Sequence, residues 1–188
     1  MIDALRSAWS SSSRRSFVVL PIAAAGFEVS RRRSPLRGGI LGLALMAAGF
    51  ALYRWTGTYR DARGGGGPGF STEPEALVTT GPYAVVRNPM YLGHLIFLAG
   101  LVACTRSPVA LTGLFLQRQR FSERVALDER RLADRFGHDY VDYIENVPRW
   151  LPALWDGKRL ISGAGAVERE LVGIGHGHRG LLDRCWPG

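Results

Sequence analysis

Apolar residues in this chain are bunched into four runs that are nearly free of charge, and this bunching limits the folds open to it. The runs are SFVVLPIAAAGF (16–27), GGILGLALMAAGFALY (38–53), MYLGHLIFLAGLVAC (90–104) and SPVALTGLFL (107–116), with arginine-rich connectors between them. A membrane-spanning helix uses about 20 apolar residues, so each run is a short span. The layout predicts an all-α, polytopic helical membrane protein with about three to four short spans and a polar amphipathic helix.

Two other classes of protein are weighed against this interpretation. A soluble helical bundle with buried core helices has apolar runs of similar length, and recovery of the protein in a carbonate-resistant membrane pellet would reject it. The formal net charge of +8 also suggests a nucleic-acid partner. The chain shows neither a recognisable binding module nor aromatic residues interleaved with its arginines, so no nucleic-acid partner is expected.

Composition divides the chain into three parts. Residues 1–15 are polar and serine-rich and are expected to be disordered, and a membrane domain is expected over 16–152. Pro21 and Glu28 make the first apolar run a poor signal peptide, which favours a first membrane segment. The segment GGGGPG (64–69) predicts a flexible loop. The glycine-rich tail, 153–188, is expected to be disordered, and its His176 and His178 alone are too few for a metal site.

Residues 117–136 have the period of an amphipathic helix, which Gly137 is expected to end. Asp128 has helical neighbours of opposite charge at positions 124 and 131. Glu129 has only apolar residues three and four positions away, and an unpaired carboxylate on a buried stripe is costly. Glu129 is therefore expected to have a partner from elsewhere in the chain, unless it only borders the stripe and reaches water.

The segment GPYAVVRNPMYLG (81–93) places polar groups at the start of the third apolar run. Pro89 suits the first turn of a helix, and a helix N-terminus attracts anionic groups through its free N–H donors. Arg87 and Tyr91 alone fit ordinary anchoring at a membrane interface. Together with Tyr83 and Asn88 they predict a binding site instead. A zwitterionic ligand matches the two segments, with its carboxylate at Arg87 and its ammonium at Glu129.

These two segments resemble the superfamily of isoprenylcysteine carboxyl methyltransferases and phospholipid methyltransferases. That superfamily has an Arg-His-Pro-x-Tyr-x-Gly motif, then an acidic pair, Phe-Gly, spaced tyrosines and Val-Pro-Arg. Here the corresponding residues run from Arg87 to Gly93, then Asp128 and Glu129, and then 136–137, 140, 143 and 147–149. The resemblance covers residues 77–152, with weaker support back to 38, so the motif core of the membrane domain is 77–152.

The resemblance implies a small integral membrane enzyme that uses S-adenosyl-L-methionine and has its active site on the cytosolic face. It assigns catalytic positions to Arg87 and Glu129. The residues implied to bind the cofactor are Tyr83, Arg87, Asn88, Pro89, Tyr91, Leu92, Gly93, Asp128, Glu129, Tyr140 and Arg149. The partners implied are the lipid bilayer and a lipophilic or lipidated methyl acceptor.

Three departures from the family pattern leave a second function open. Asn88 stands where the pattern has histidine, and asparagine forms hydrogen bonds but does not titrate near neutral pH. The last apolar run is short, because QRQR (117–120) follows it, and the tail after Pro152 has no counterpart. The alternative is therefore a catalytically weak membrane protein that keeps the fold as a binding or structural module. If the 54–88 loop and the 117–152 region are both cytosolic, the connector RRRSPLR (31–37) is expected on the opposite face, against the positive-inside rule. In that case either the segment 16–27 does not cross the membrane or the second helix is oriented by its C-terminal charges.

Overall fold

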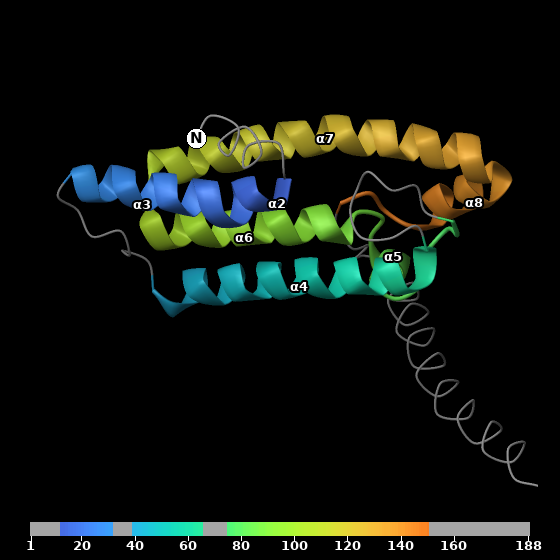
Figure 1. Cartoon of the computed structure of the whole chain (residues 1–188), viewed down its shortest axis with the longest axis horizontal. Helices are drawn as coiled ribbons and strands as arrows, with labels where there is room; N and C mark the ends of the chain where they lie inside the picture. Colours follow the sequence, from blue (N-terminus) through green and yellow to red (C-terminus); the bar gives the residue numbers. More distant parts are fainter. Residues whose placement is uncertain (1–11, 32–38, 66–74, 151–188) are drawn as a thin grey trace, which may run out of the picture.

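A computed structural model describes residues 12–31, 39–65 and 75–150. Within these residues all the regular secondary structure is helical (Figure 1). A continuous N-terminal helical stretch consists of α2 (Ser12–Arg14), the π-helical turn η1 (Arg15–Val19) and α3 (Leu20–Ser30). The remaining helices are α4 (Ile40–Gly64), α5 (Pro82–Val85), α6 (Pro89–Thr105), α7 (Pro108–Phe136) and α8 (His138–Asn146). The predicted all-α class is confirmed for these residues.

Several predicted boundaries are confirmed and others are wrong. Pro89 is the first residue of α6, and α7 ends before Gly137, whose φ of 53° only glycine adopts readily. Residues 12–15 are helical, although disorder was expected there. The second apolar helix continues well past Tyr53 to Gly64, because WTGTYRDAR lacks a helix-breaking proline. The rest of the segments 1–15 and 64–69, and the tail 153–188, lie outside the described residues.

The fourth apolar run (107–116) and the amphipathic helix (117–136) belong to one element, because α7 passes through both without interruption. Its apolar first half and its charged second half form one rod 29 residues long. The segment QRQRFSERVALDERR contains no glycine or proline and is rich in strong helix formers, so nothing in it ends the helix. The apolar and the charged parts of the sequence are thereby joined in a single continuous helix (Figure 1).

Helices α4 and α6 pack closely through glycines spaced seven residues apart. A methyl group added at Gly93 would lie 2.8 Å from the backbone oxygen of Gly49, and one added at Gly100 would lie 2.6 Å from the backbone nitrogen of Met46. Small residues that let helix backbones approach in this way are typical of helix pairs in membranes.

The N-terminal helices pack against α7 in the opposite direction. Gln117 donates a hydrogen bond to Ser16 at 3.0 Å, Leu20 contacts Gly113, and Ala24 packs with Ala110. This register brings residues 12–16 to the middle of α7, where its sequence changes from apolar to charged (Figure 1).

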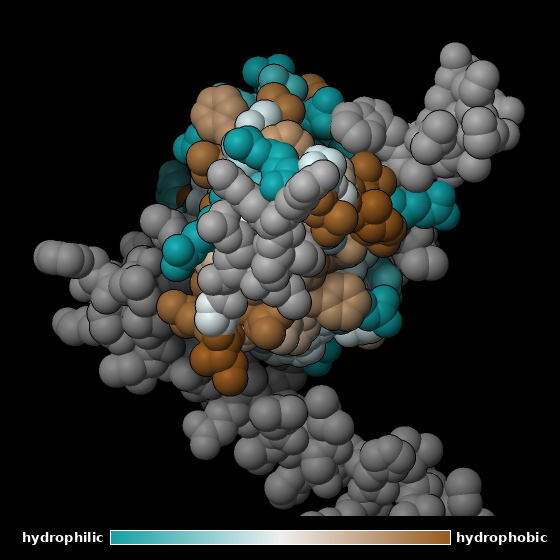
Figure 2. All heavy atoms as spheres, turned by 90° about the vertical axis from the view of Figure 1, so that its left-hand side faces the viewer, coloured by the Kyte–Doolittle hydropathy of each residue, from teal (hydrophilic) through white to brown (hydrophobic). Residues whose placement is uncertain are grey.

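One described helix, α4, is long and apolar enough to cross a membrane, and α6 is a shorter apolar helix. Only 17% of the most apolar window of α4 is buried, whereas a core helix of a soluble protein would be mostly buried. Large exposed apolar side chains also occur on α3 and on the first half of α7, and Figure 2 shows apolar surface around the end of the bundle where α7 begins. The surface suits a lipid environment, and the number of spans stays a prediction.

Candidate functional site

The connector between α5 and α6 is held by hydrogen bonds to the segment after α8. Gly81 has φ of 58° and lets the chain turn into α5, and Val86 is extended. The backbone N–H of Arg87 donates to the carbonyl of Pro148 at 2.9 Å, and the amide of Asn88 donates to the carbonyl of Arg149 at 3.2 Å. Segments about 60 residues apart in the chain are thus fixed side by side.

Glu129 lies between two arginines from these paired segments. Arg87 Nη1 is 3.1 Å from Glu129 Oε1. Arg149 donates from Nε to Oε1 at 3.1 Å and from Nη2 to Oε2, which makes a bidentate pair. The side chains of Arg87 and Glu129 are each only 14% exposed, whereas that of Arg149 is 44% exposed. The prediction that Glu129 needs a partner from elsewhere in the chain is confirmed.

Tyrosines surround this ion cluster and stay protonated. The pKa of Tyr140 is raised to about 12. Burial is the largest cause and the nearby Glu129 carboxylate adds to it, while the Arg87 guanidinium opposes the shift. Burial also raises the pKa of Tyr83 to about 12. Tyr143 donates a hydrogen bond to the carbonyl of Tyr83 at 2.7 Å and so ties α8 to α5. At neutral pH these phenols are neutral groups around a charged centre.

Asp128 faces different surroundings from Glu129, because successive helix residues point about 100° apart. The Tyr91 hydroxyl donates to Asp128 Oδ2 at 3.1 Å, and Arg131 Nη1 lies 3.9 Å from Oδ1. Tyr91 packs in a buried cluster with Phe121 and Val125, against which Trp150 also lies. Burial raises the pKa of the Asp128 carboxyl, although the Tyr91 hydrogen bond and nearby arginines lower it.

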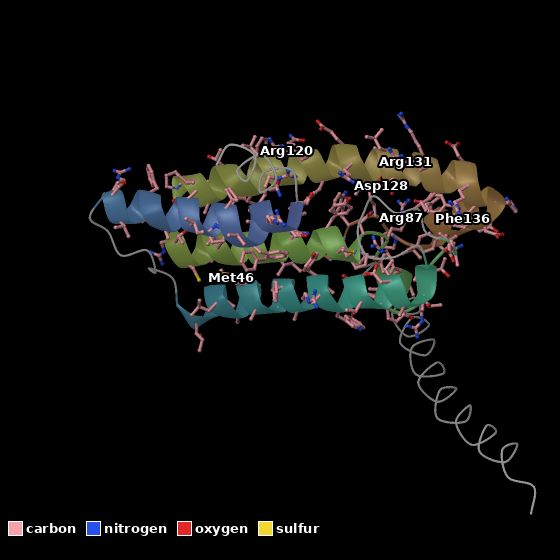
Figure 3. All side chains as sticks on the ribbon, in the orientation of Figure 1. Met46, Arg87, Arg120, Asp128, Arg131 and Phe136 are labelled. Carbon is pink, nitrogen blue, oxygen red and sulfur yellow. The ribbon has the colours of Figure 1, made fainter. Side chains whose placement is uncertain are left out.

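The structure brings together part of the predicted set. Arg87, Glu129, Arg149 and Tyr140 form one cluster, with Asn88 and the buried Pro89 beside it at the start of α6. Figure 3 shows Arg87 close to the second half of α7. Gly93 instead faces α4 and serves helix packing, and Leu92 is half-buried. The predicted site residues did not include Pro148 or Trp150, although Pro148 belongs to the Val-Pro-Arg motif at 147–149.

One donor in the cluster has no partner. Arg87 Nε is buried and forms no hydrogen bond within the described residues. A buried guanidinium N–H without an acceptor is costly, so the site has unused capacity for an anionic oxygen. The residues therefore fit the carboxylate of a zwitterionic ligand, while Glu129 fits its ammonium. Within the described part of the chain, no three His, Cys, Asp or Glu side chains are grouped to hold a metal ion.

The family described as "Phospholipid methyltransferase" matches residues 38–122, which include Arg87 and Tyr91 and end before Asp128. Over 81 residues the chain is 35% identical to protein-S-isoprenylcysteine O-methyltransferase B of Arabidopsis thaliana. This match covers 43% of this chain and 41% of that protein. The Xenopus laevis protein-S-isoprenylcysteine O-methyltransferase is 35% identical over 82 residues, 43% of this chain and 28% of its own length. The chain belongs to the isoprenylcysteine carboxyl methyltransferase and phospholipid methyltransferase superfamily.

Similarity to a third relative extends over a larger part of this chain. The nickel-cobalt-cadmium resistance protein NccN of Alcaligenes xylosoxydans xylosoxydans is 30% identical over 148 residues, 79% of this chain and 61% of that protein. The chain thus spans less than two thirds of the length of each of these three relatives. No solved structure matches it.

Proposed function

We propose that this superfamily member is a membrane methyltransferase that uses S-adenosyl-L-methionine and acts on a lipidic or amphipathic acceptor. The observation that carries the proposal is the cluster of Arg87, Glu129 and Arg149, which three distant segments bring together. Family membership supports a methyl-transfer role, and the exposed apolar surface of α4 supports a membrane setting.

The charges of the cluster suit the amino-acid part of the donor. Two guanidiniums face one carboxylate, so the cluster has an excess of one positive charge. A carboxylate that binds Arg87 Nε satisfies the unpartnered donor, and an ammonium that binds Glu129 replaces part of its pairing with Arg149. Because Arg149 is the more exposed arginine, it is the one free to move when the ligand enters.

The protein's own residues have to hold the methyl donor in place and to exclude water from the site. When bound, the cofactor supplies an electrophilic methyl group on a sulfonium. The arginines and Glu129 would fix the donor, and Tyr83 and Tyr140 would close the site without adding charge. In-line displacement needs alignment and a dry site more than a strong base. No general base is assigned, because Asn88 does not titrate.

Isothermal titration calorimetry on the detergent-purified full chain tests the proposal. We expect S-adenosyl-L-methionine to bind wild type, and Glu129→Gln and Arg87→Gln to weaken binding by about tenfold or more, since each removes a charge-assisted hydrogen bond. Glu145→Gln, on the exposed face of α8, is the matched control and should bind normally. Absence of binding to folded wild-type protein would refute the proposal.

A second candidate is a catalytically weak membrane protein that binds the cofactor without efficient transfer. The asparagine at position 88 is the observation that favours it, because its amide is engaged with the Arg149 carbonyl and cannot accept a proton. Transfer of a radioactive methyl group to lipid extracts of the host separates the two candidates. Label in the extract supports the enzyme, and binding without label supports the alternative.

A further inference from the structure

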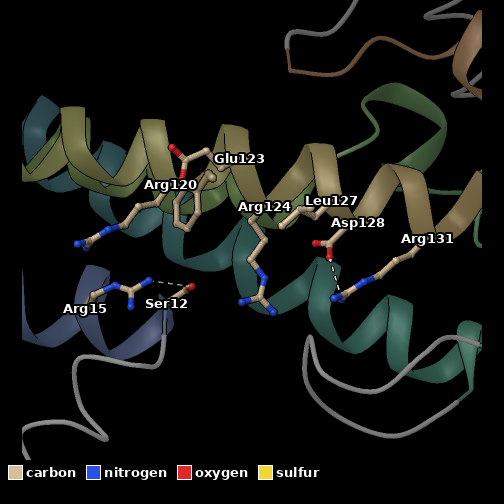
Figure 4. A pocket seen from close by; sticks show the side chains of 9 residues that line it. Ser12, Arg15, Arg120, Glu123, Arg124, Leu127, Asp128 and Arg131 are labelled. Carbon is tan, nitrogen blue, oxygen red and sulfur yellow. Dashed lines mark hydrogen bonds and ion pairs between the residues drawn. The ribbon is translucent and has the colours of Figure 1, made fainter.

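A polar cavity lies between α7 and the N-terminal helical stretch. It has a volume of about 350 Å³ and is separate from the Arg87 cluster. Figure 4 shows side chains from the middle of α7 directed toward Arg15 and Ser12. Its charged lining residues are Arg15, Arg120, Arg124, Arg131, Glu123 and Asp128.

The charge of this cavity is unbalanced. Four arginines face two carboxylates, which leaves an excess of two positive charges. One carboxylate, Asp128, pairs with Arg131 and accepts a hydrogen bond from Tyr91. Burial lowers the pKa of Arg15, and the charges of Arg120 and Arg124 lower it further. The guanidiniums therefore repel one another across the cavity, and an anion placed among them would relieve that repulsion.

The cavity lies at the level where α7 changes from apolar to charged. Leu111, Phe115 and Leu116 are each about half exposed on the first half of the helix, and the arginines begin at position 118. Leu127, also exposed, lines the cavity itself. Basic residues that directly follow an exposed apolar surface are placed at the depth of lipid headgroups.

We propose that this cavity binds the phosphate of an anionic phospholipid headgroup through Arg15, Arg120 and Arg124. Guanidinium groups match phosphate oxygens with paired N–H donors, which gives them a geometric advantage over a point charge. The exposed apolar surface of the first half of α7, which precedes Arg120 in the helix, suits an acyl chain. A soluble phosphate shares the headgroup chemistry but gains nothing from the apolar surface. This inference does not rest on methyl transfer.

Lipid titration followed by native mass spectrometry of the detergent-purified full chain tests this site. The probes are phosphatidylglycerol and phosphatidylcholine with identical acyl chains. We expect phosphatidylglycerol to bind about tenfold more tightly, because only its headgroup carries a net negative charge. Glycerol 3-phosphate and inorganic phosphate serve as soluble competitors, and we expect them to displace the lipid only at much higher concentrations.

Two double variants of equal charge change separate this site from general surface electrostatics. Arg120→Gln with Arg124→Gln should abolish the preference for phosphatidylglycerol. Arg118→Gln with Arg130→Gln, on the same helix but outside the cavity, should keep it. If the first variant does not fold, Arg120→Lys with Arg124→Lys keeps the charge and should lose part of the preference, because lysine lacks the paired donors.

Four results would overturn the inference. They are equal affinity for the two lipids, an equal loss in both double variants, no loss in the lysine variant, and displacement of the lipid by soluble phosphate at equal concentration. The last result would assign the cavity to a soluble anion. Each result is independent of S-adenosyl-L-methionine binding at the Arg87 cluster.

Discussion

The two arginines that bind Glu129 should contribute unequally to stability, and burial should decide the order. Arg149 has the better geometry, because it makes a bidentate pair, but its side chain is 44% exposed. Arg87 makes a single contact at 3.1 Å but is only 14% exposed. Solvent screens exposed pairs and holds their worth to about 0.2–1 kcal/mol, whereas a hydrogen bond to a charged group in a mostly buried setting contributes about 1.5–3 kcal/mol.

Double-mutant cycles measure both couplings directly. Glu129→Gln is combined in turn with Arg87→Gln and with Arg149→Gln, and the free energy of unfolding is measured by denaturant titration in mixed micelles. Trp150 packs beside the site against Tyr91 and Phe121 and provides a fluorescence signal. We expect a coupling of about 1.5–3 kcal/mol for Arg87 and about 0.5–1 kcal/mol for Arg149. An Arg149 coupling equal to or larger than that of Arg87 would refute the argument that burial outweighs geometry.

Two further predictions concern helix packing and the charge of the cavity. Gly100→Ala should lower the free energy of unfolding by about 1–3 kcal/mol, because the added methyl group meets the α4 backbone. Gly26→Ala, which has open space around it, should be neutral or should stabilise the protein by up to about 1 kcal/mol. Equal effects in thermal unfolding would contradict this account of α4–α6 packing. Burial raises the pKa of Asp128, so its carboxyl gains a proton at a higher pH than an ordinary aspartate and the cavity becomes more positive as pH falls through that range. Affinity for phosphatidylglycerol should therefore rise on acidification. Asp128→Asn should show the raised affinity already at neutral pH and should lose this pH dependence. Unchanged affinity in that variant would contradict the role given to the Asp128 charge.

The helices and one feature of the site followed from residue patterns alone. Charge-free runs predicted helices, and the prolines at positions 89 and 108 mark the starts of α6 and α7. The apolar neighbours of Glu129 required a distant partner, and the structure supplies two. This inference succeeded because the helical period fixes which side chains are neighbours, and a buried carboxylate cannot remain unpaired.

Features that depend on contacts between helices could not be read from the sequence. The sequence changes from apolar to charged residues at position 117, yet the two parts form one helix, because composition alone does not end a helix without a breaking residue. Residues 12–15 looked too polar to be ordered, but packing of the N-terminal stretch against α7 places Arg15 beside Gln117 at 3.3 Å. Gly93 matched a cofactor motif, whereas its position against α4 depends on helix pairing.

The continuity of α7 gives the two proposed sites a fixed spacing. Glu129 is five residues from Arg124 and nine from Arg120, which at the rise of an α-helix corresponds to about 8 Å and about 14 Å along its axis. Asp128 and Glu129 point in different directions, one toward the arginine cavity and the other toward Arg87. A phosphate held by Arg124 would therefore lie about 8 Å along the helix axis from the level of Glu129. Because α7 is unbroken at position 117, the apolar surface of its first half would fix the depth of both proposed sites relative to the lipid.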